Sequence, residues 1–229
     1  MCQFANYASY CGATFPPPAR LYRQMRWEWG VRNKDEESRG YGGCAGDCNH
    51  SGGVVRGRGY TFIIFSQPKA ADPEERWIGL ERDGAVYRIG TIGGEAYESQ
   101  VEASSVALFG QPYICLAGYC GANCAVEHYI EVKDGMPVPL LFLNAPARVA
   151  DWNGDGMNEL LYQEGMPLDV VLIQRWGGKL ISASVGEALH AAKGVSYDDA
   201  ARRFILYNEQ GEQHYRVAAD GNFLELVSR

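Results

Sequence analysis

The stretch Arg-Trp-Ile-Gly-Leu-Glu-Arg-Asp-Gly-Ala-Val-Tyr-Arg-Ile, residues 76–89, contains the pattern that decides the fold. Apolar and polar residues alternate on both sides of Asp83-Gly84, and Asp-Gly is among the strongest signals for a two-residue hairpin turn. The stretch therefore predicts two antiparallel strands joined by a tight turn.

This unit recurs along the chain. In each unit the second residue of the turn is a glycine. These glycines are residues 84, 135, 178 and 221, with intervals of 51, 43 and 43 residues. Each turn also follows a further apolar run, so the predicted strands are 60–65, 76–82, 85–89, 113–116, 127–132, 138–143, 159–162, 169–174, 179–182, 203–207, 213–217 and 223–227. A further strand is expected at 100–109, and a short helix at 185–193.

A period of about 40–50 residues with about four strands is typical of β-propeller blades. We therefore predict an all-β, propeller-like array of about four antiparallel repeat units over residues 58–229. A β-sandwich built from the same hairpins is the alternative fold.

Residues 1–57 have a different composition. They contain four of the seven cysteines, three consecutive prolines at 16–18 and a glycine-rich run from 40 to 59, without sustained periodicity. This composition predicts an irregular or disordered N-terminal extension. A wrongly assigned start site is an alternative explanation of the segment.

One polar loop interrupts the repeats. Between residues 151 and 160 the chain reads Asp-Trp-Asn-Gly-Asp-Gly-Met-Asn-Glu-Leu, with oxygen-bearing side chains at Asp151, Asn153, Asp155 and Glu159. Three carboxylates this close in sequence repel one another strongly unless a cation lies between them. Calcium prefers six to eight oxygen ligands, and glycines permit the tight turn that would gather them. The loop therefore predicts a calcium site.

Two other interpretations of this loop explain its sequence less well. A plain Asn-Gly/Asp-Gly turn explains the glycines but not the regular spacing of the oxygens. An EF-hand requires a bidentate Glu at position 12, where counting from Asp151 gives Tyr162, and the flanking apolar runs suit strands better than helices.

The loop resembles a known pattern. Asp151-x-Asn153-Gly154-Asp155-Gly156-x-x-Glu159-Leu160 is similar to the calcium loop of FG-GAP/VCBS-type repeats, found in integrin alpha-subunit propellers and many bacterial surface proteins. In that family the loop leads into the first strand of a propeller blade, and the ion holds the loop without doing chemistry. The resemblance implies as ligands the side chains of Asp151, Asn153, Asp155 and Glu159 and the carbonyl of Met157. Glu159 stands where the family usually has Asp.

The cysteines offer a second kind of candidate site. The chain has seven, so at least one is unpaired within it. For Cys115, Cys120 and Cys124 we expect either a Cys120–Cys124 disulfide with Cys115 buried, or a zinc site that includes His128. Cys44-x3-Cys48-x-His50 is a second, weaker zinc candidate.

Charge and hydropathy narrow the class of partner. A net charge of −7 argues against a nucleic-acid partner, which requires a basic face. No run approaches the roughly 18 apolar residues of a membrane span. A secretory signal is not visible, yet a modestly charged calcium loop is most useful where calcium is plentiful, outside the cytosol. We therefore expect an extracytoplasmic protein recorded without its leader.

The sequence contains none of the common catalytic motifs considered below. The four histidines form no motif with a serine or cysteine nucleophile, and Gly-x-Ser-x-Gly, phosphate-loop and His-Glu-x-x-His patterns are missing from the sequence. The sequence predicts a noncatalytic calcium-binding domain for recognition or scaffolding at a cell surface, with a protein or glycan as partner. The alternatives are a carbohydrate-active hydrolase with an Asp/Glu pair and a zinc-stabilised interaction module.

Overall fold

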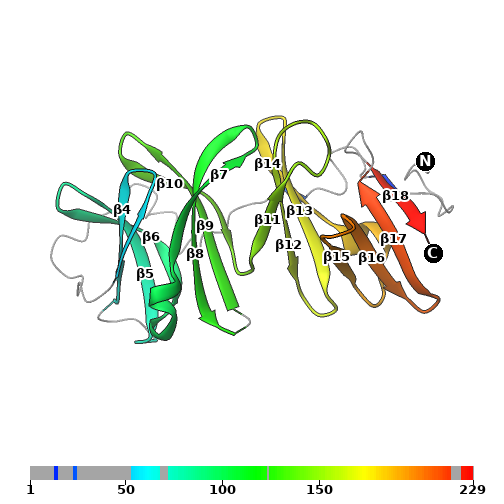
Figure 1. Cartoon of the computed structure of the whole chain (residues 1–229), viewed down its shortest axis with the longest axis horizontal. Coiled ribbons are helices and arrows are strands. Elements are labelled where there is room, and N and C mark those ends of the chain that lie inside the picture. Colours follow the sequence, from blue (N-terminus) through cyan, green and yellow to red (C-terminus); the bar gives the residue numbers. More distant parts are fainter. Residues whose placement is uncertain are drawn as a thin grey trace. The chain divides into compact units, whose positions relative to one another are not determined.

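The computed structural model of the chain describes residues 13–14, 23–24, 53–67, 72–122, 124–217 and 223–228. The described chain is almost entirely β-structure, and its strands form four antiparallel sheets (Figure 1). The all-β prediction is confirmed. Most of the predicted N-terminal extension, including the Cys44/Cys48/His50 zinc candidate, lies outside the described residues.

The chain divides into two compact units, which we describe separately. Unit 2 comprises Glu28–Ala107, of which residues 53 onward are mainly described, and Gln111–Pro146. Its first sheet contains, in spatial order, β3 (Val54–Gly57), β4 (Tyr60–Phe65), β5 (Glu75–Arg82) and β6 (Ala85–Gly94). A 3-10 helix, η1 (Glu95–Gln100), leads to the second sheet, which consists of β7 (Glu102–Leu108), β8 (Gln111–Gly121), β9 (Cys124–Lys133) and β10 (Met136–Leu143). Strand β3 thus lies within the segment that the sequence assigned to the extension.

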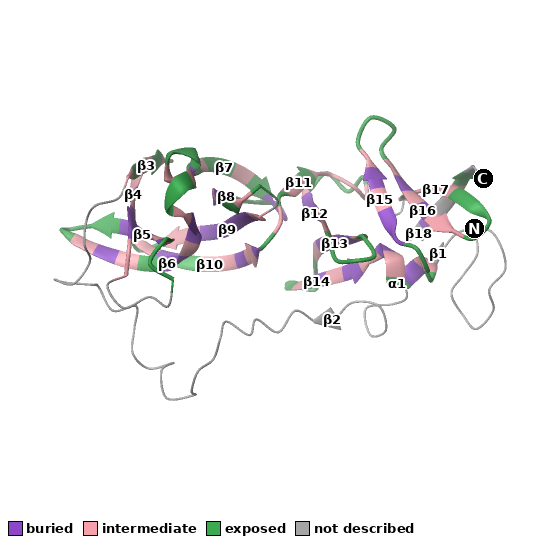
Figure 2. Ribbon diagram, turned by 90° about the horizontal axis from the view of Figure 1, so that it is seen from below, coloured by how far each residue is buried: buried purple, intermediate pink, exposed green. Residues whose placement is uncertain are grey.

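The two sheets of unit 2 share one apolar core. Buried side chains from both sheets meet there, among them Phe62, Ile78 and Leu80 from the first and Leu116 and Ile130 from the second. Figure 2 shows buried residues recurring along the strands of this unit. Because successive side chains of a strand point to opposite faces, the period-2 apolar pattern supplies this core.

Unit 1 comprises Leu108–Gly110 and Ala147–Arg229, together with the short strands β1 (Ala13–Thr14) and β2 (Arg23–Gln24). One sheet has the order β11 (Ala147–Ala150), β12 (Glu159–Glu164), β13 (Asp169–Trp176), β14 (Lys179–Ser184) and β2. Helix α1 (Val185–Leu189) leads to the other sheet, which contains β15 (Val195–Asp198), β16 (Arg203–Asn208), β17 (Gly211–Val217), β18 (Phe223–Ser228) and β1. Buried residues of both sheets form the core of unit 1, including Leu161, Val170, Val195, Phe204 and Leu224.

Turn chemistry explains why the hairpins form where the sequence predicted them. At three of the predicted turns, both central residues have positive φ: 53° and 78° at Asp83-Gly84, the same at Asp134-Gly135, and 54° and 79° at Gly177-Gly178. These values suit type I′ turns, whose twist matches that of the flanking strands. The same geometry recurs at Phe109-Gly110, with φ of 52° and 75°, although Phe-Gly is not a typical turn dipeptide.

Several predicted elements differ in length from the observed ones, among them β8, β9 and α1. Strands β8 and β9 continue almost to their shared turn, so the loop expected between 116 and 127 is instead a hairpin, with Gly121 paired to Cys124. Helix α1 is shorter than the predicted 185–193, because His190 adopts a left-handed conformation with φ of 53° and ends it at Leu189.

Candidate metal site

The predicted calcium loop connects β11 to β12 within unit 1. These strands are antiparallel neighbours, and Ala150 pairs with Glu159 across the ladder. The pairing places Asp151, the residue after Ala150, beside the start of β12. Gly154 and Gly156, with φ of 78° and 87°, let residues 151–158 curl back between the two strand ends.

The carboxylate of Asp151 organises the loop. Its Oδ1 accepts hydrogen bonds from the backbone N–H groups of Gly154 at 2.7 Å and Asp155 at 3.1 Å. Its Oδ2 accepts another from Gly156 at 3.0 Å. Asp155 also accepts a hydrogen bond from the loop backbone, because its Oδ1 accepts the N–H of Met157, two residues later, at 2.8 Å. The loop is therefore held by side chain–backbone bonds of the kind that Asp forms in turns.

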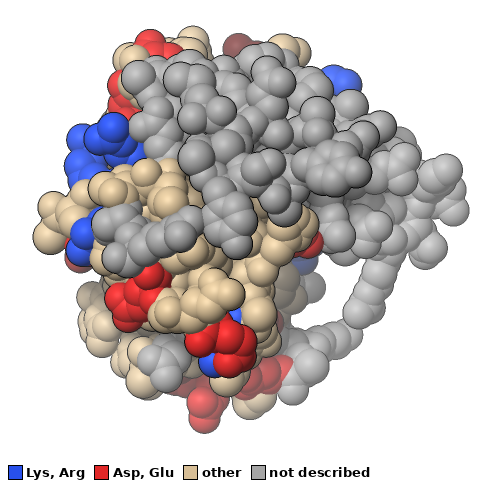
Figure 3. Space-filling model, turned by 90° about the vertical axis from the view of Figure 1, so that its right-hand side faces the viewer, with Lys and Arg blue, Asp and Glu red and all other residues tan. Residues whose placement is uncertain are grey.

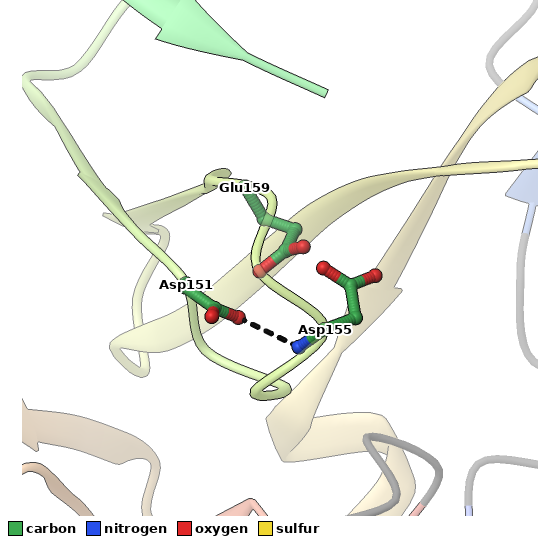
Figure 4. Close-up of side chains that lie close together, drawn as sticks. All are labelled: Asp151, Asp155 and Glu159. Atoms are coloured by element: carbon green, nitrogen blue, oxygen red, sulfur yellow. Dashed lines mark hydrogen bonds between the residues drawn. The ribbon is translucent and has the colours of Figure 1, made fainter. Parts of the chain in front are cut away.

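Three carboxylates converge in this loop. One oxygen from each of Asp151, Asp155 and Glu159 lies within 4.8 Å of the other two (Figure 4). Among the described residues, none of these three forms an ion pair with a Lys, Arg or His side chain. Like charges at this separation repel unless a cation or a proton compensates them. A set composed only of oxygen donors suits a hard divalent cation.

Glu159 is the unusual member of this group. It is only 5% exposed, whereas Asp155 is exposed to solvent. Burial raises the pKa of its carboxyl to about 7, and the charges of Asp155 and Asp151 add to the rise. The N–H of Trp152 donates a 2.9 Å hydrogen bond to Glu159 Oε2 and acts in the opposite direction. A cation at the site would favour the ionised form of this buried group.

The other two predicted ligands are placed differently. The side chain of Asn153 faces Asp155: its Oδ1 accepts the Asp155 N–H at 2.8 Å, and its Nδ2 donates to Asp155 Oδ2 at 3.2 Å. Met157 lies on the same loop and is 42% exposed. The structure brings together the three carboxylates of the predicted set, and the ligand roles of all five residues stay predictions.

The cysteine candidates of unit 2 lie at the hairpin of β8 and β9. Cys120 and Cys124 form a disulfide, with their Cα atoms 5.1 Å apart. Cys115 is a buried free thiol, and burial raises its pKa to about 12. The ring of His128 is buried, with Nε2 2.6 Å from the carbonyl of Thr91. This arrangement favours the disulfide over a zinc site shared with His128.

Two surface clefts bear on the hydrolase alternative. In unit 2, Glu95 and Glu98 line a cleft, but both pair with the buried Arg76, at 2.7 and 3.3 Å. In unit 1, Asp169 lines a second cleft, and its carboxylate accepts hydrogen bonds from Ser184 and from the Gly186 N–H. Each of these three carboxylates is therefore engaged with neighbouring groups of the protein.

The surface charge agrees with an acidic chain. Among the described residues visible in Figure 3, Lys and Arg side chains lie beside Asp and Glu side chains. In the described part of the chain, no helix has the length and hydropathy needed to cross a membrane.

The structure also joins the loop to residues that the sequence did not connect with it. The ring of Trp152 contacts that of Tyr197 on β15, edge to face, with centroids 4.9 Å apart. Spacing along the chain does not predict this contact, because Trp152 lies in the loop and Tyr197 lies on a strand of the other sheet, 45 positions later.

A scan of the chain against models of known protein families found no match, and neither did a search of curated proteins.

Proposed function

We propose that this chain is a noncatalytic, extracytoplasmic domain that binds one calcium ion and serves recognition or scaffolding at a cell surface. The observation that carries the proposal is the convergence of Asp151, Asp155 and the buried Glu159 within 4.8 Å. A buried carboxylate without a described cationic partner is costly. A divalent cation would offset that cost and the repulsion among the three groups.

The donor set selects the ion. Zinc favours Cys and His ligands in structural sites, and this loop contains neither. Magnesium demands near-ideal octahedral geometry, whereas calcium accepts irregular sets of carboxylate, amide and carbonyl oxygens. A loop with Asp151, Asn153, Asp155, Glu159 and the Met157 carbonyl in reach offers that irregular set, and the ion's role would be to fix the loop between β11 and β12.

Fold and compartment form part of the same proposal. Each unit contains two four-stranded meanders, apart from the added β1 and β2, as an array of FG-GAP/VCBS-type propeller blades would. The Cys120–Cys124 disulfide supports an oxidising, extracytoplasmic compartment, where calcium is also abundant. The recognition partner in this proposal is a protein or a glycan.

Calorimetric titration of calcium into the chelator-treated full chain tests the ion site. We expect saturable one-site binding and a rise in melting temperature, since a hundredfold excess over Kd stabilises a folded protein by about 2.7 kcal/mol. Magnesium at the same concentration should compete weakly. Asp155→Asn should abolish the shift because it removes one ligand charge.

Asp134→Asn is the matched control. Asp134 is also an exposed Asp that precedes a glycine in a turn, and Asn tolerates its positive φ of 53°. This variant should bind calcium as the unchanged protein does. Equal calcium binding by Asp155→Asn and the unchanged chain would contradict the proposal.

A further inference from the structure

Trp152 contacts Glu159 through its backbone N–H, whereas its side chain packs against the other sheet of unit 1. Trp152 donates its N–H to Glu159 Oε2 at 2.9 Å. Its ring packs on the core shared by the two sheets of unit 1 and contacts Tyr197 of β15. The same residue therefore contacts a predicted ion ligand through its backbone and the neighbouring sheet through its ring.

Tyr197 is itself firmly placed. It is 7% exposed, its ring lies 5.1 Å from that of Phe204, and its strand pairs with β16 through a Tyr197–Phe204 match. A rotation of Trp152 would require this aromatic cluster to repack, and tightly packed interiors resist such changes. The ring contact thus restricts the orientation of the Trp152 peptide.

The turn between β15 and β16 closes over the same point. Arg202 places its guanidinium 5.9 Å from the centroid of the Trp152 ring, and its Nη2 donates to the carbonyl of Asp151 at 3.4 Å. A positive charge next to a cation site opposes cation binding by simple electrostatics. Arg202 lies here because its guanidinium contacts the Trp152 ring and the Asp151 carbonyl. These two contacts hold the Asp151–Trp152 segment beside the turn that follows β15.

We infer that Trp152 and Tyr197 are positioning residues for the metal loop: the Tyr197 ring fixes Trp152, whose N–H orients the Glu159 carboxylate toward Asp151 and Asp155. This inference rests on the proposed calcium function and adds residues that touch no ion. Residues outside the ligand shell that orient metal ligands typically contribute about 10–100-fold to metal affinity.

Calcium titration of ring-removing and ring-keeping variants in the full chain tests this role. Trp152→Leu and Tyr197→Leu should each raise the calcium Kd about tenfold or more. Trp152→Phe and Tyr197→Phe should restore most of the affinity, because an aromatic ring stays in the contact. Trp152→Phe also removes an indole N–H that is buried without a hydrogen-bond partner in the described structure.

Tyr207→Leu serves as the matched control. Tyr207 lies on β16, half-buried, and bonds Ser196 at 3.1 Å, on the face opposite Phe204 and Tyr197. Its loss should leave the calcium Kd unchanged. Unchanged calcium affinity in both Leu variants overturns the inference and leaves the proposed function standing, whereas a wild-type chain that binds no calcium overturns both.

If the Leu variants do not fold, hydrogen exchange on the unchanged protein tests whether the metal loop is coupled to β15. Adding calcium should slow exchange at the Trp152 amide and, together with it, in the turn that includes Arg202. Protection limited to residues 153–157 would show that the ion site is not coupled to β15 and would overturn the inference.

Discussion

The carboxylate of Asp151 accepts a hydrogen bond from the backbone N–H of Gly156, at 3.0 Å across five residues. The bond closes the loop only because Gly156 adopts a φ of 87°, in a region that L-residues with a Cβ rarely occupy. Space is not the constraint, since a Cβ built on Gly156 meets nothing within 4 Å. The requirement for glycine here is one of backbone conformation.

Gly156→Ala should therefore destabilise the loop by about 1 kcal/mol, through backbone strain alone, and weaken calcium binding in proportion. Gly156→Asn should lose less, because Asn tolerates positive φ better than Ala. Thermal denaturation and calcium titration of the two variants check this. An Ala variant as stable as the Asn variant would contradict the strain argument.

Glu159→Gln should flatten the pH dependence of stability of the metal-free protein. Burial raises the folded-state pKa of Glu159 from 4.5 to about 7, so the folded state binds more protons than the unfolded state between these values. Stability due to this group is then fully present below about pH 4.5 and is lost as pH rises to about 7.

The loss can reach on the order of 3 kcal/mol, from about 1.4 kcal/mol per pKa unit. Glu159→Gln cannot ionise, so at pH 8 without calcium the variant should be more stable than the unchanged protein. Chemical denaturation from pH 4 to 8 in chelator measures this difference. With calcium present the order should reverse, since Gln supplies no charge to the ion.

Gly118→Ala should destabilise unit 2. Gly118 on β8 lies against the backbone of Ile92 on β6, and an added Cβ would collide with the Ile92 carbonyl. Overpacking of this kind costs about 1–3 kcal/mol. Gly121→Ala is the control, because its nearest new neighbour, the Cβ of Cys124, is at an ordinary 3.8 Å. Urea denaturation should separate the two variants, and equal midpoints would refute the close approach of β6 and β8.

Cys115 should be unreactive in the native protein. Burial raises the pKa of its thiol to about 12, and only the thiolate attacks alkylating reagents. Mass spectrometry after iodoacetamide treatment at pH 8 should find Cys115 unlabelled in the native chain and labelled after denaturation. Without reductant, Cys120 and Cys124 should remain unlabelled in both states because they form a disulfide. Rapid native labelling of Cys115 would contradict its burial.

Local patterns predicted much of the secondary structure. The strands around Asp83-Gly84, Asp134-Gly135 and Gly177-Gly178 lie where the sequence placed them, and the turns have the expected positive φ angles. Such features depend on neighbouring residues, since turn type and strand alternation are set within a few positions. Local patterns did not predict strand β3 or the full length of β8 and β9, because pairing with neighbouring strands extends the sheet beyond the apolar runs.

The sequence by itself also determined which residues form the acidic loop, because Asp151, Asp155 and Glu159 are close along the chain and the glycines permit the bend. Tertiary structure alone decided that Glu159 is buried, that Trp152 meets Tyr197 and that the turn at Arg202 contacts the Asp151 carbonyl. The physical reason is that these contacts join separate sheets. They arise when two sheets bury a shared core, and no spacing along the chain specifies which side chains then meet.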